Sequence, residues 1–276
     1  MTDTKKTIRL GQMEEIIQDF FDDIDFDNVE KCDASKEKSC VDCLSNGYFS
    51  DIQIDYSCFT KRKLYVVRYL PVHVAEVVNA LKSIPATAME QLLDNKQLNI
   101  LCVGGGPGTD NLALNTWLDH MTTFKDYRVS SVTITRLDKC EEWDDISPNI
   151  IWEQQPESLD FELHRKLYDV TKTGLKTTKS HLVVMSYIMS EIKEKQLVTL
   201  AENLLKNTYD GWVLVVNDRD EVAVTAKVEK LVKLLKGRIV VNNNSKPHCG
   251  FTYPDEIWEK AEPKIWLKSA RYVAII

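Results

Sequence analysis

The chain lacks any apolar run long enough to span a membrane. Its longest runs, residues 181–187 and 212–216, fall far short of the roughly 20 apolar residues that a bilayer-spanning helix requires. The N-terminal segment is polar and then amphipathic; it has no continuous apolar core of the kind a secretory signal carries, and its acids are not typical of a transit peptide. We therefore expect no membrane association and a location in the cytoplasm or the nucleus.

Cysteines are few and odd in number, and basic residues are in deficit. Seven cysteines in 276 residues favour reduced thiols over a disulfide framework, because a chain of this size can fold on its apolar core. The 35 Lys and Arg residues stand against 42 Asp and Glu, which gives a formal net charge of −7. This charge disfavours non-specific binding to phosphate backbones, although a local basic face can still bind nucleic acid.

The hydrophobic periodicity changes near residue 96. Before it, apolar residues at helical spacing predict helices over 12–30 and 61–82, and Pro71 is expected to start or kink a helix. After it, short apolar runs alternate with amphipathic segments, a pattern typical of βα units around a mainly parallel sheet. We therefore predict an N-terminal, mainly helical cap over residues 1–96 and an α/β domain over residues 97–276.

Seven strands and three helices are predicted in the second part. The strands are expected at 98–103, 130–137, about 163–168, 181–187, 212–217, 238–242 and 264–275, the last of which can be divided. The third strand has an alternative at 149–154. The helices are expected at 108–120, 191–206 and 221–236.

A glycine-rich turn follows the first predicted strand and precedes a helix. The sequence NILCVGGGPGTD over 99–110 contains Gly104, Gly105, Gly106, Pro107 and Gly108. Such glycines let the backbone turn tightly and approach a ligand closely, and Asp110 can cap the following helix. The spacing GxGxG, with Thr109 and Asn111 where a helical glycine would be needed, disfavours NAD. The turn therefore predicts a nucleotide-like ligand at the carboxyl end of the strand.

A strand followed by VGGGPGTD resembles motif I of the class I S-adenosylmethionine-dependent methyltransferases. The number and order of the predicted strands fit the seven-stranded, mostly parallel α/β fold of that family over residues 97–276. The resemblance implies S-adenosyl-L-methionine as the cofactor. It also implies a carboxylate at the end of the second strand that binds the ribose hydroxyls, here Asp138, whose two oxygens can accept from vicinal hydroxyls.

Other positions carry over from the same resemblance. The family's third strand often ends in a polar group near the adenine. Here that group is Asp169, or Asp160 if the third strand lies at 149–154. The alternative for Asp169 is an ordinary solvated acid in a loop. The chain departs from the family in Cys102, where many members have an acid. It also departs in the interval of 34 residues from Gly104 to Asp138, longer than the roughly 20 of a minimal unit.

The segment HLVVMSYIMSEI over 181–192 occupies the place of the family's motif IV. The Asn or Asp, two prolines and an aromatic residue of amino-group methyltransferases are absent. The arrangement SYxxSE instead resembles methyltransferase-like proteins related to a mitochondrial ribosomal small-subunit factor. We expect Ser186 and Tyr187 to contact the cofactor or to line the substrate mouth, while Glu191 is either a catalytic candidate or a helix-start acid favoured by the dipole.

Candidates outside these motifs come from three other segments. Tyr65 and Arg68 precede motif I. In the family this segment often covers the cofactor, and an arginine there can bind the cofactor's carboxylate. The alternative is a surface arginine beside core tyrosines, and His73 is a weaker candidate. His248 is either a base beside the substrate pocket or an ordinary loop histidine. The cysteines Cys32, Cys40, Cys43 and Cys58 contain a single CxxC, which favours reduced thiols over a metal site.

The resemblance carried by these residues implies an S-adenosylmethionine-dependent methyltransferase, for which we expect an RNA or protein acceptor. Methyl transfer needs mainly in-line positioning and exclusion of water, because the sulfonium is already electrophilic. The catalytic candidates are Tyr187, Glu191 and His248. The alternative is a catalytically inactive scaffold or cofactor-sensing subunit of a protein complex, and a partner protein is compatible with either.

Overall fold

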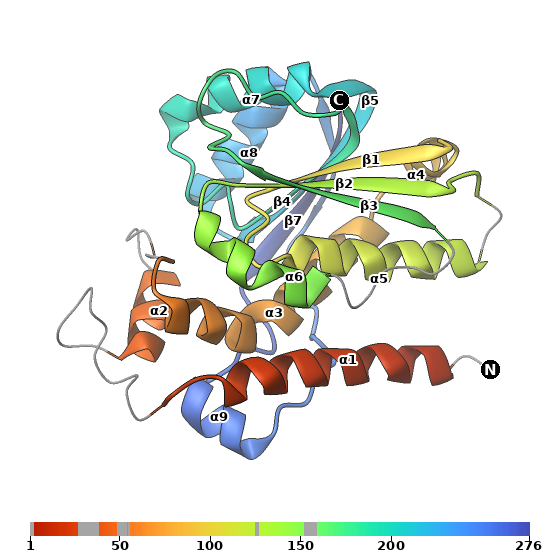
Figure 1. Ribbon diagram of the computed structural model, residues 1–276. Helices are drawn as coiled ribbons and strands as arrows, with labels where there is room; N and C mark the ends of the chain where they lie inside the picture. Colours follow the sequence, from red (N-terminus) through yellow and green to blue (C-terminus); the bar gives the residue numbers. More distant parts are fainter. Residues whose placement is uncertain (1–2, 27–38, 49–53, 55, 125–126, 152–158) are drawn as a thin grey trace.

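The computed structural model describes residues 3–26, 39–48, 54, 56–124, 127–151 and 159–276 (Figure 1). The helices before the sheet are α1 (Asp3–Asp22), α2 (Cys40–Tyr48), α3 (Phe59–Lys82) and α4 (Ala86–Leu93). The strands are β1 (Gln97–Val103), β2 (Ser131–Asp138), β3 (Asp160–Leu167), β4 (Ser180–Ser186), β5 (Thr208–Arg219), β6 (Arg238–Asn243) and β7 (Ser269–Ile275). Between them lie α5 (Thr109–Phe124), η1 (Glu141–Asp145), α6 (Ser147–Ile151), η3 (Glu194–Gln196), α7 (Leu197–Lys206), α8 (Val222–Leu234) and α9 (Asp255–Ala261).

The strands form one seven-stranded sheet in the order β3-β2-β1-β4-β5-β7-β6. β1 pairs in parallel with both β2 and β4, and β7 runs antiparallel to β5 and β6. The order therefore reverses at β1, where the chain leaves one half of the sheet for the other. This is the seven-stranded, mostly parallel fold expected from the resemblance to class I methyltransferases, and the prediction of fold class is confirmed.

Buried strands of a sheet covered on both faces read as continuous apolar runs, and β1 shows this pattern. Leu98, Ile100 and Cys102 face a core shared with α1, α3 and α5. Leu101 and Val103 face a second core shared with α7 and α8. Figure 1 shows these two groups of helices on opposite sides of the sheet.

Pro71 lies inside α3, which continues through it from Phe59 to Lys82. A proline has no N–H, so the carbonyl four residues earlier loses its helical partner, and the ring crowds that turn. Here the Val67 carbonyl accepts a hydrogen bond from the Tyr253 hydroxyl at 3.0 Å. The Arg68 carbonyl accepts from the Lys264 amide at 2.9 Å. The segment between β6 and β7 thus satisfies the backbone groups that the proline disturbs.

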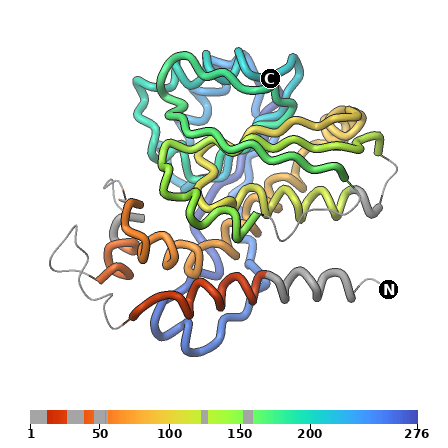
Figure 2. Tube along the Cα trace, viewed as in Figure 1, coloured from red at the N-terminus to blue at the C-terminus, as the bar shows by residue number. Residues whose placement is uncertain are grey.

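The segment between β6 and β7 carries α9 and lies against the N-terminal helices, as the trace in Figure 2 shows. Ile257 and Ala261 of α9 are buried in the same core as Ile17 and Leu64. That core also contains residues of β1 and β2. The N-terminal helices and the sheet therefore share apolar packing, and the domain boundary at residue 96 stays a prediction.

Several predicted elements differ in detail from those observed. The helix expected over 12–30 is α1, which begins and ends earlier, and α3 does not start at Pro71. The alternative third strand at 149–154 is wrong, because residues 147–151 form α6 and β3 lies at Asp160–Leu167. The helix expected at 191–206 starts as η3 and continues as α7, and the last strand covers only Ser269–Ile275. Within the described residues, no helix has the length and apolar character needed to cross a bilayer.

Candidate functional site

A cavity of about 1130 Å³ opens at the carboxyl ends of β1, β2, β3 and β4. This is the place where the strand order reverses, which is where open α/β sheets bind their ligands. Among the predicted residues, its lining contains Tyr65, Gly104, Gly105, Gly106, Pro107, Asp110, Asp138, Asp169, Ser186, Tyr187 and Glu191. The structure therefore brings together residues from five separate segments that were predicted to form one site.

The turn after β1 is attached to the end of β2. The amides of Gly104 and Gly105 donate to the Leu137 carbonyl at 2.8 and 3.2 Å. Gly106 has φ +46°, a left-handed conformation that favours glycine, and a Cβ there would have its nearest neighbours 3.9 Å away. A side chain at Gly106 would therefore enter space beside the cavity rather than the core. Gly108 follows the turn and packs against Ile151.

Asp138, the last residue of β2, has both carboxylate oxygens at the turn. Its Oδ2 accepts from the Gly106 amide at 2.8 Å, and its Oδ1 accepts from the Cys140 amide at 2.9 Å. Each carboxylate oxygen has two lone pairs, so a further acceptor position remains on each. Asp138 thus fixes the glycine turn and can still bind hydroxyl groups in the cavity.

Arg136 also supports the glycine turn, and sequence reasoning missed it. The side chain is buried, and its Nη1 donates to the Gly106 carbonyl at 2.6 Å. Its Nη2 forms an ion pair with Asp144 of η1. The available signal was a single arginine within the predicted strand at 130–137, which in a central strand indicates a buried charge with a specific partner.

Asp110 lies in the first turn of α5 and is 2% exposed. Its Oδ2 has no hydrogen-bond partner among the residues that the structure describes. Burial, together with the charge of Asp138, raises the pKa of Asp110 to about 8. A buried carboxyl with one oxygen unpartnered among the described residues, at the wall of a cavity, is matched to a cationic group on a ligand, which would favour its ionised form.

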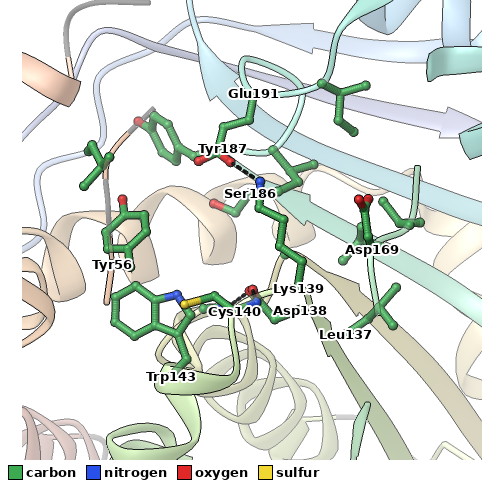
Figure 3. Close-up of a pocket in the computed structure, with 18 of the residues that line it drawn as sticks. Tyr56, Leu137, Asp138, Lys139, Cys140, Trp143, Asp169, Ser186, Tyr187 and Glu191 are labelled. Atoms are coloured by element: carbon green, nitrogen blue, oxygen red, sulfur yellow. Dashed lines mark hydrogen bonds and ion pairs between the residues drawn. The ribbon is translucent and has the colours of Figure 1, made fainter. Parts of the chain in front are cut away.

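Asp169 follows β3 and lines the cavity next to Leu167, whose side chain is 57% exposed. Its Oδ1 accepts from the Thr171 amide at 2.9 Å and from the Thr171 hydroxyl at 2.6 Å. Although burial favours the neutral acid, these bonds and nearby lysines lower the pKa of Asp169. In the view of Figure 3, Asp169 lies on one side of Asp138, while Tyr56 and Trp143 lie together on the other side.

Ser186, Tyr187 and Glu191 follow one another where β4 ends (Figure 3). Tyr187 has φ +54°, which is rare for a bulky side chain and indicates strain that surrounding contacts must hold. Its amide donates to the Asn217 carbonyl at 2.7 Å, and the Ser186 hydroxyl accepts from the Asn217 amide group at 3.2 Å. Glu191 lies 3.6 Å from Lys139 in a partly exposed ion pair.

Glu76 of α3 is fully buried beneath Tyr187, and sequence reasoning missed it. Its Oε2 lies 3.2 Å from His73 Nδ1 and accepts from the Tyr187 hydroxyl at 3.0 Å and the Asn217 amide group at 3.1 Å. Its Oε1 accepts from the Ser269 hydroxyl at 2.6 Å. Although burial favours the neutral acid, the hydrogen bonds to His73, Ser269 and Asn217 lower the pKa of Glu76. His73 lines the cavity.

Aromatic rings form one wall of the cavity. Tyr56 lies 4.9 Å from Trp143 and 5.6 Å from Tyr65, measured between ring centroids. Tyr65 lies 5.5 Å from Trp143 and 5.9 Å from His73, and His73 lies 4.3 Å from Tyr187. We call Tyr56, Tyr65 and Trp143 the aromatic wall.

Three of the predicted ligand or catalytic residues do not line the cavity: Gly108, Arg68 and His248. Arg68 is fully buried away from the cavity lining, where its guanidinium donates to the Val41 carbonyl at 3.0 Å and the Ser45 hydroxyl at 2.7 Å. It therefore does not face a ligand in the cavity. His248 is exposed in the loop after β6 and is not part of the lining.

The cysteine candidates are placed only in part. Cys32 lies outside the described residues, while Cys40 and Cys43 belong to α2 and Cys58 precedes α3. In the part of the chain that the structure covers, no three or more His, Cys, Asp or Glu side chains are grouped as metal ligands.

Comparison with known proteins finds likeness in structure only. No protein-family model and no curated protein matches the chain. The N-methyltransferase NodS from Bradyrhizobium japonicum, solved with S-adenosylhomocysteine, is 12% identical over 64% of this chain and 77% of its own, with a TM-score of 0.40. A SAM-dependent methyltransferase from Methanosarcina mazei is 10% identical over 70% of this chain and 97% of its own, with a TM-score of 0.47.

An rRNA methylase from Streptococcus thermophilus is a third such structure. It is 10% identical over 68% of this chain and 92% of its own, with a TM-score of 0.42. At these identities the likeness concerns the fold, so the function has to be argued from the cavity itself.

Proposed function

We propose that this chain, which has the class I methyltransferase fold, binds S-adenosylmethionine in the cavity and transfers its methyl group to an acceptor. The observation that carries the proposal is the pairing of two different acids at one glycine turn. Asp138 offers open acceptor positions, and Asp110 offers a buried oxygen that has no partner among the described residues. A ligand with a hydroxyl pair and a cation matches both, and S-adenosylmethionine carries a ribose diol and an amino group.

The ribose would be held at Asp138. Two vicinal hydroxyls can donate to the two oxygens of one carboxylate, and the Gly106 and Cys140 amides keep that carboxylate oriented toward the cavity edge. Gly106 has no side chain to fill the space beside the turn. The turn can therefore approach the ligand closely, as glycine turns at the end of the first strand do.

The methionine end would be held at Asp110. A cationic amino group beside a buried carboxyl favours its ionised form and supplies the donor that Oδ2 lacks. The adenine would lie toward Asp169 and Leu167. The exposed apolar side chain of Leu167 gives a flat base a surface to cover.

When bound, S-adenosylmethionine supplies a methyl group on a sulfonium, so the protein's part is to position and shield the reacting groups. Ser186 and Tyr187 lie at the end of β4, between the glycine turn and α3, and line the cavity. We assign them to the face where the acceptor enters. The RNA or protein acceptor expected from the sequence stays a prediction.

Calorimetric titration with S-adenosylmethionine, S-adenosylhomocysteine and NAD tests this proposal. Micromolar binding of the first two without binding of NAD is expected. A wild-type protein that binds neither sulfur ligand overturns the proposal. Binding without methyl transfer to any RNA, protein or small aromatic hydroxyl compound would instead favour the scaffold or sensor.

A matched pair of valine variants locates the ligand. Gly106 and Gly250 both have positive φ, and neither Cβ would have a neighbour closer than 3.9 Å. A valine therefore strains the backbone at both sites, but only Gly106→Val fills the cavity. We expect at least about a hundredfold loss of S-adenosylmethionine affinity in Gly106→Val, some 3 kcal/mol, and unchanged affinity in Gly250→Val. Equal affinities in the two variants would place the ligand elsewhere.

A further inference from the structure

His73 and Glu76 form a buried pair where α3 packs against β5 and β7. His73 is 1% exposed yet lines the cavity, and Glu76 is fully buried behind it. With Nδ1 as the donor to Glu76 at 3.2 Å, Nε2 of the neutral ring is its proton acceptor. A histidine oriented by a buried carboxylate is an arrangement suited to general-base work.

Glu76 is held as an anion by several donors. Besides His73, it accepts hydrogen bonds from Tyr187, Asn217 and Ser269. A carboxylate with this many donors is stable in the charged form even when buried. It therefore orients the His73 ring and stabilises the imidazolium that forms when His73 takes up a proton.

Tyr187 connects this pair to the end of β4. Its ring lies 4.3 Å from the His73 ring, and its hydroxyl donates to the same Glu76 oxygen. Its left-handed backbone, φ +54°, is strain of the kind that collects at ligand sites. Among the described residues, the carboxylate of Glu76 and the phenols Tyr65, Tyr69 and Tyr187 lie against His73.

The cavity has room for a second molecule beside the cofactor. Its volume of about 1130 Å³ exceeds the roughly 300–1,000 Å³ that sites for one small ligand usually have. The aromatic wall continues from Tyr56 and Trp143 through Tyr65 to His73. Rings of this kind pack against a planar aromatic ligand in offset or edge-to-face geometry.

We propose that the acceptor is an aromatic hydroxyl compound whose ring lies against the aromatic wall and whose proton passes to His73. This inference rests on the proposed function and names its substrate class. In the transfer, the phenol O–H bond breaks and its proton goes to Nε2 of His73. The O–CH₃ bond forms as the S–CH₃ bond breaks, and the electron pair of that bond stays on sulfur. Glu76 is a positioning residue in this step.

The probe 4-nitrophenol tests the inference, because its phenolate is yellow and its neutral form is not. It is added to the S-adenosylhomocysteine complex at about pH 6, where the free probe is mostly protonated. We expect the wild-type complex to bind the probe as the phenolate. His73→Gln, which keeps a polar group near Glu76, is expected to bind it at least about tenfold less as phenolate. His248→Gln makes the same change on an exposed loop and is expected to behave as wild type.

Each other outcome has a definite meaning. A wild-type complex that binds only the neutral probe, or His73→Gln that still binds the phenolate, overturns the role of His73. An S-adenosylhomocysteine complex that binds no probe overturns the aromatic hydroxyl subsite. A protein that does not bind S-adenosylhomocysteine fails the proposed function instead.

A second measurement uses the wild-type protein and therefore does not depend on whether His73→Gln folds. The chain has five histidines, so nitrogen NMR of the labelled wild-type protein can follow each ring during the same titration. The His73 ring is expected to take the imidazolium signature when the probe binds. A ring that stays neutral while the probe is bound as phenolate overturns the proposal.

Discussion

Asp110→Asn tests the energetic role of the buried carboxyl at the glycine turn. Asp110 is 2% exposed, and burial with the charge of Asp138 raises its pKa to about 8. Asparagine has nearly the same shape but cannot ionise. The substitution therefore separates the ionisation of this group from its packing.

The sign of the effect follows from proton linkage. An aspartic acid in the unfolded chain has a pKa of about 3.9, so the folded protein holds this proton over a pH range where the unfolded chain has lost it. The stability that the protonated acid contributes is complete below the unfolded pKa and is lost as pH rises to the folded pKa. At 1.36 kcal/mol per pH unit, the free energy of unfolding should fall by about 4 kcal/mol between about pH 5 and pH 8, relative to Asp110→Asn.

Urea unfolding of both proteins at several pH values measures this difference. A constant offset between them reflects the amide and does not matter; only its change with pH does. A difference that stays constant from pH 5 to pH 8 would refute the reasoning. With S-adenosylmethionine, the wild type should also release close to one proton at about pH 7, because a cation at Asp110 lowers its pKa. Calorimetry in buffers of different ionisation enthalpy detects that proton, and Asp110→Asn should release none.

Three further substitutions probe contacts around the site. Tyr253→Phe removes the donor to the Val67 carbonyl that Pro71 leaves unpaired, so the free energy of unfolding in urea should fall by about 1–3 kcal/mol. In a Pro71→Ala background this loss of stability should largely vanish. An equal loss in both backgrounds would contradict this account. Arg68→Met should lower the free energy of unfolding by about 2–4 kcal/mol, because its buried hydrogen bonds are lost. The affinity for S-adenosylmethionine should stay within about twofold, because Arg68 lies outside the cavity. A tenfold loss of affinity would instead identify Arg68 as a ligand contact. Arg136→Met should weaken S-adenosylmethionine binding about tenfold in calorimetry, since Gly106 loses a backbone partner, and unchanged affinity would count against that support.

Local sequence was sufficient for the sheet and for much of the cavity. The strand β1 and the turn Gly104–Gly108 are adjacent in the chain, and their patterns depend on strand burial and on glycine backbone freedom. Asp138 was expected from the resemblance to class I methyltransferases, and the parallel pairing of β1 with β2 places it beside the turn. Such features are short in range, so one stretch of residues determines each of them.

The tertiary structure alone decided the environments of the charged side chains. By sequence Glu76 is an ordinary helix acid and Asp110 a helix cap, yet packing buries both. Glu76 lies among several donors, whereas Oδ2 of Asp110 has no partner in the part of the chain that the structure covers. Arg68 belongs to the same helix as Tyr65 and His73 but turns away from the cavity to α2. Helical spacing shows which residues share a face, but it does not show which segment covers that face. For Arg68 that segment is α2, and for Glu76 it is β5 and β7, more than a hundred residues away. The free energy of a charge depends on its partners and on burial, so its role follows from the assembled fold.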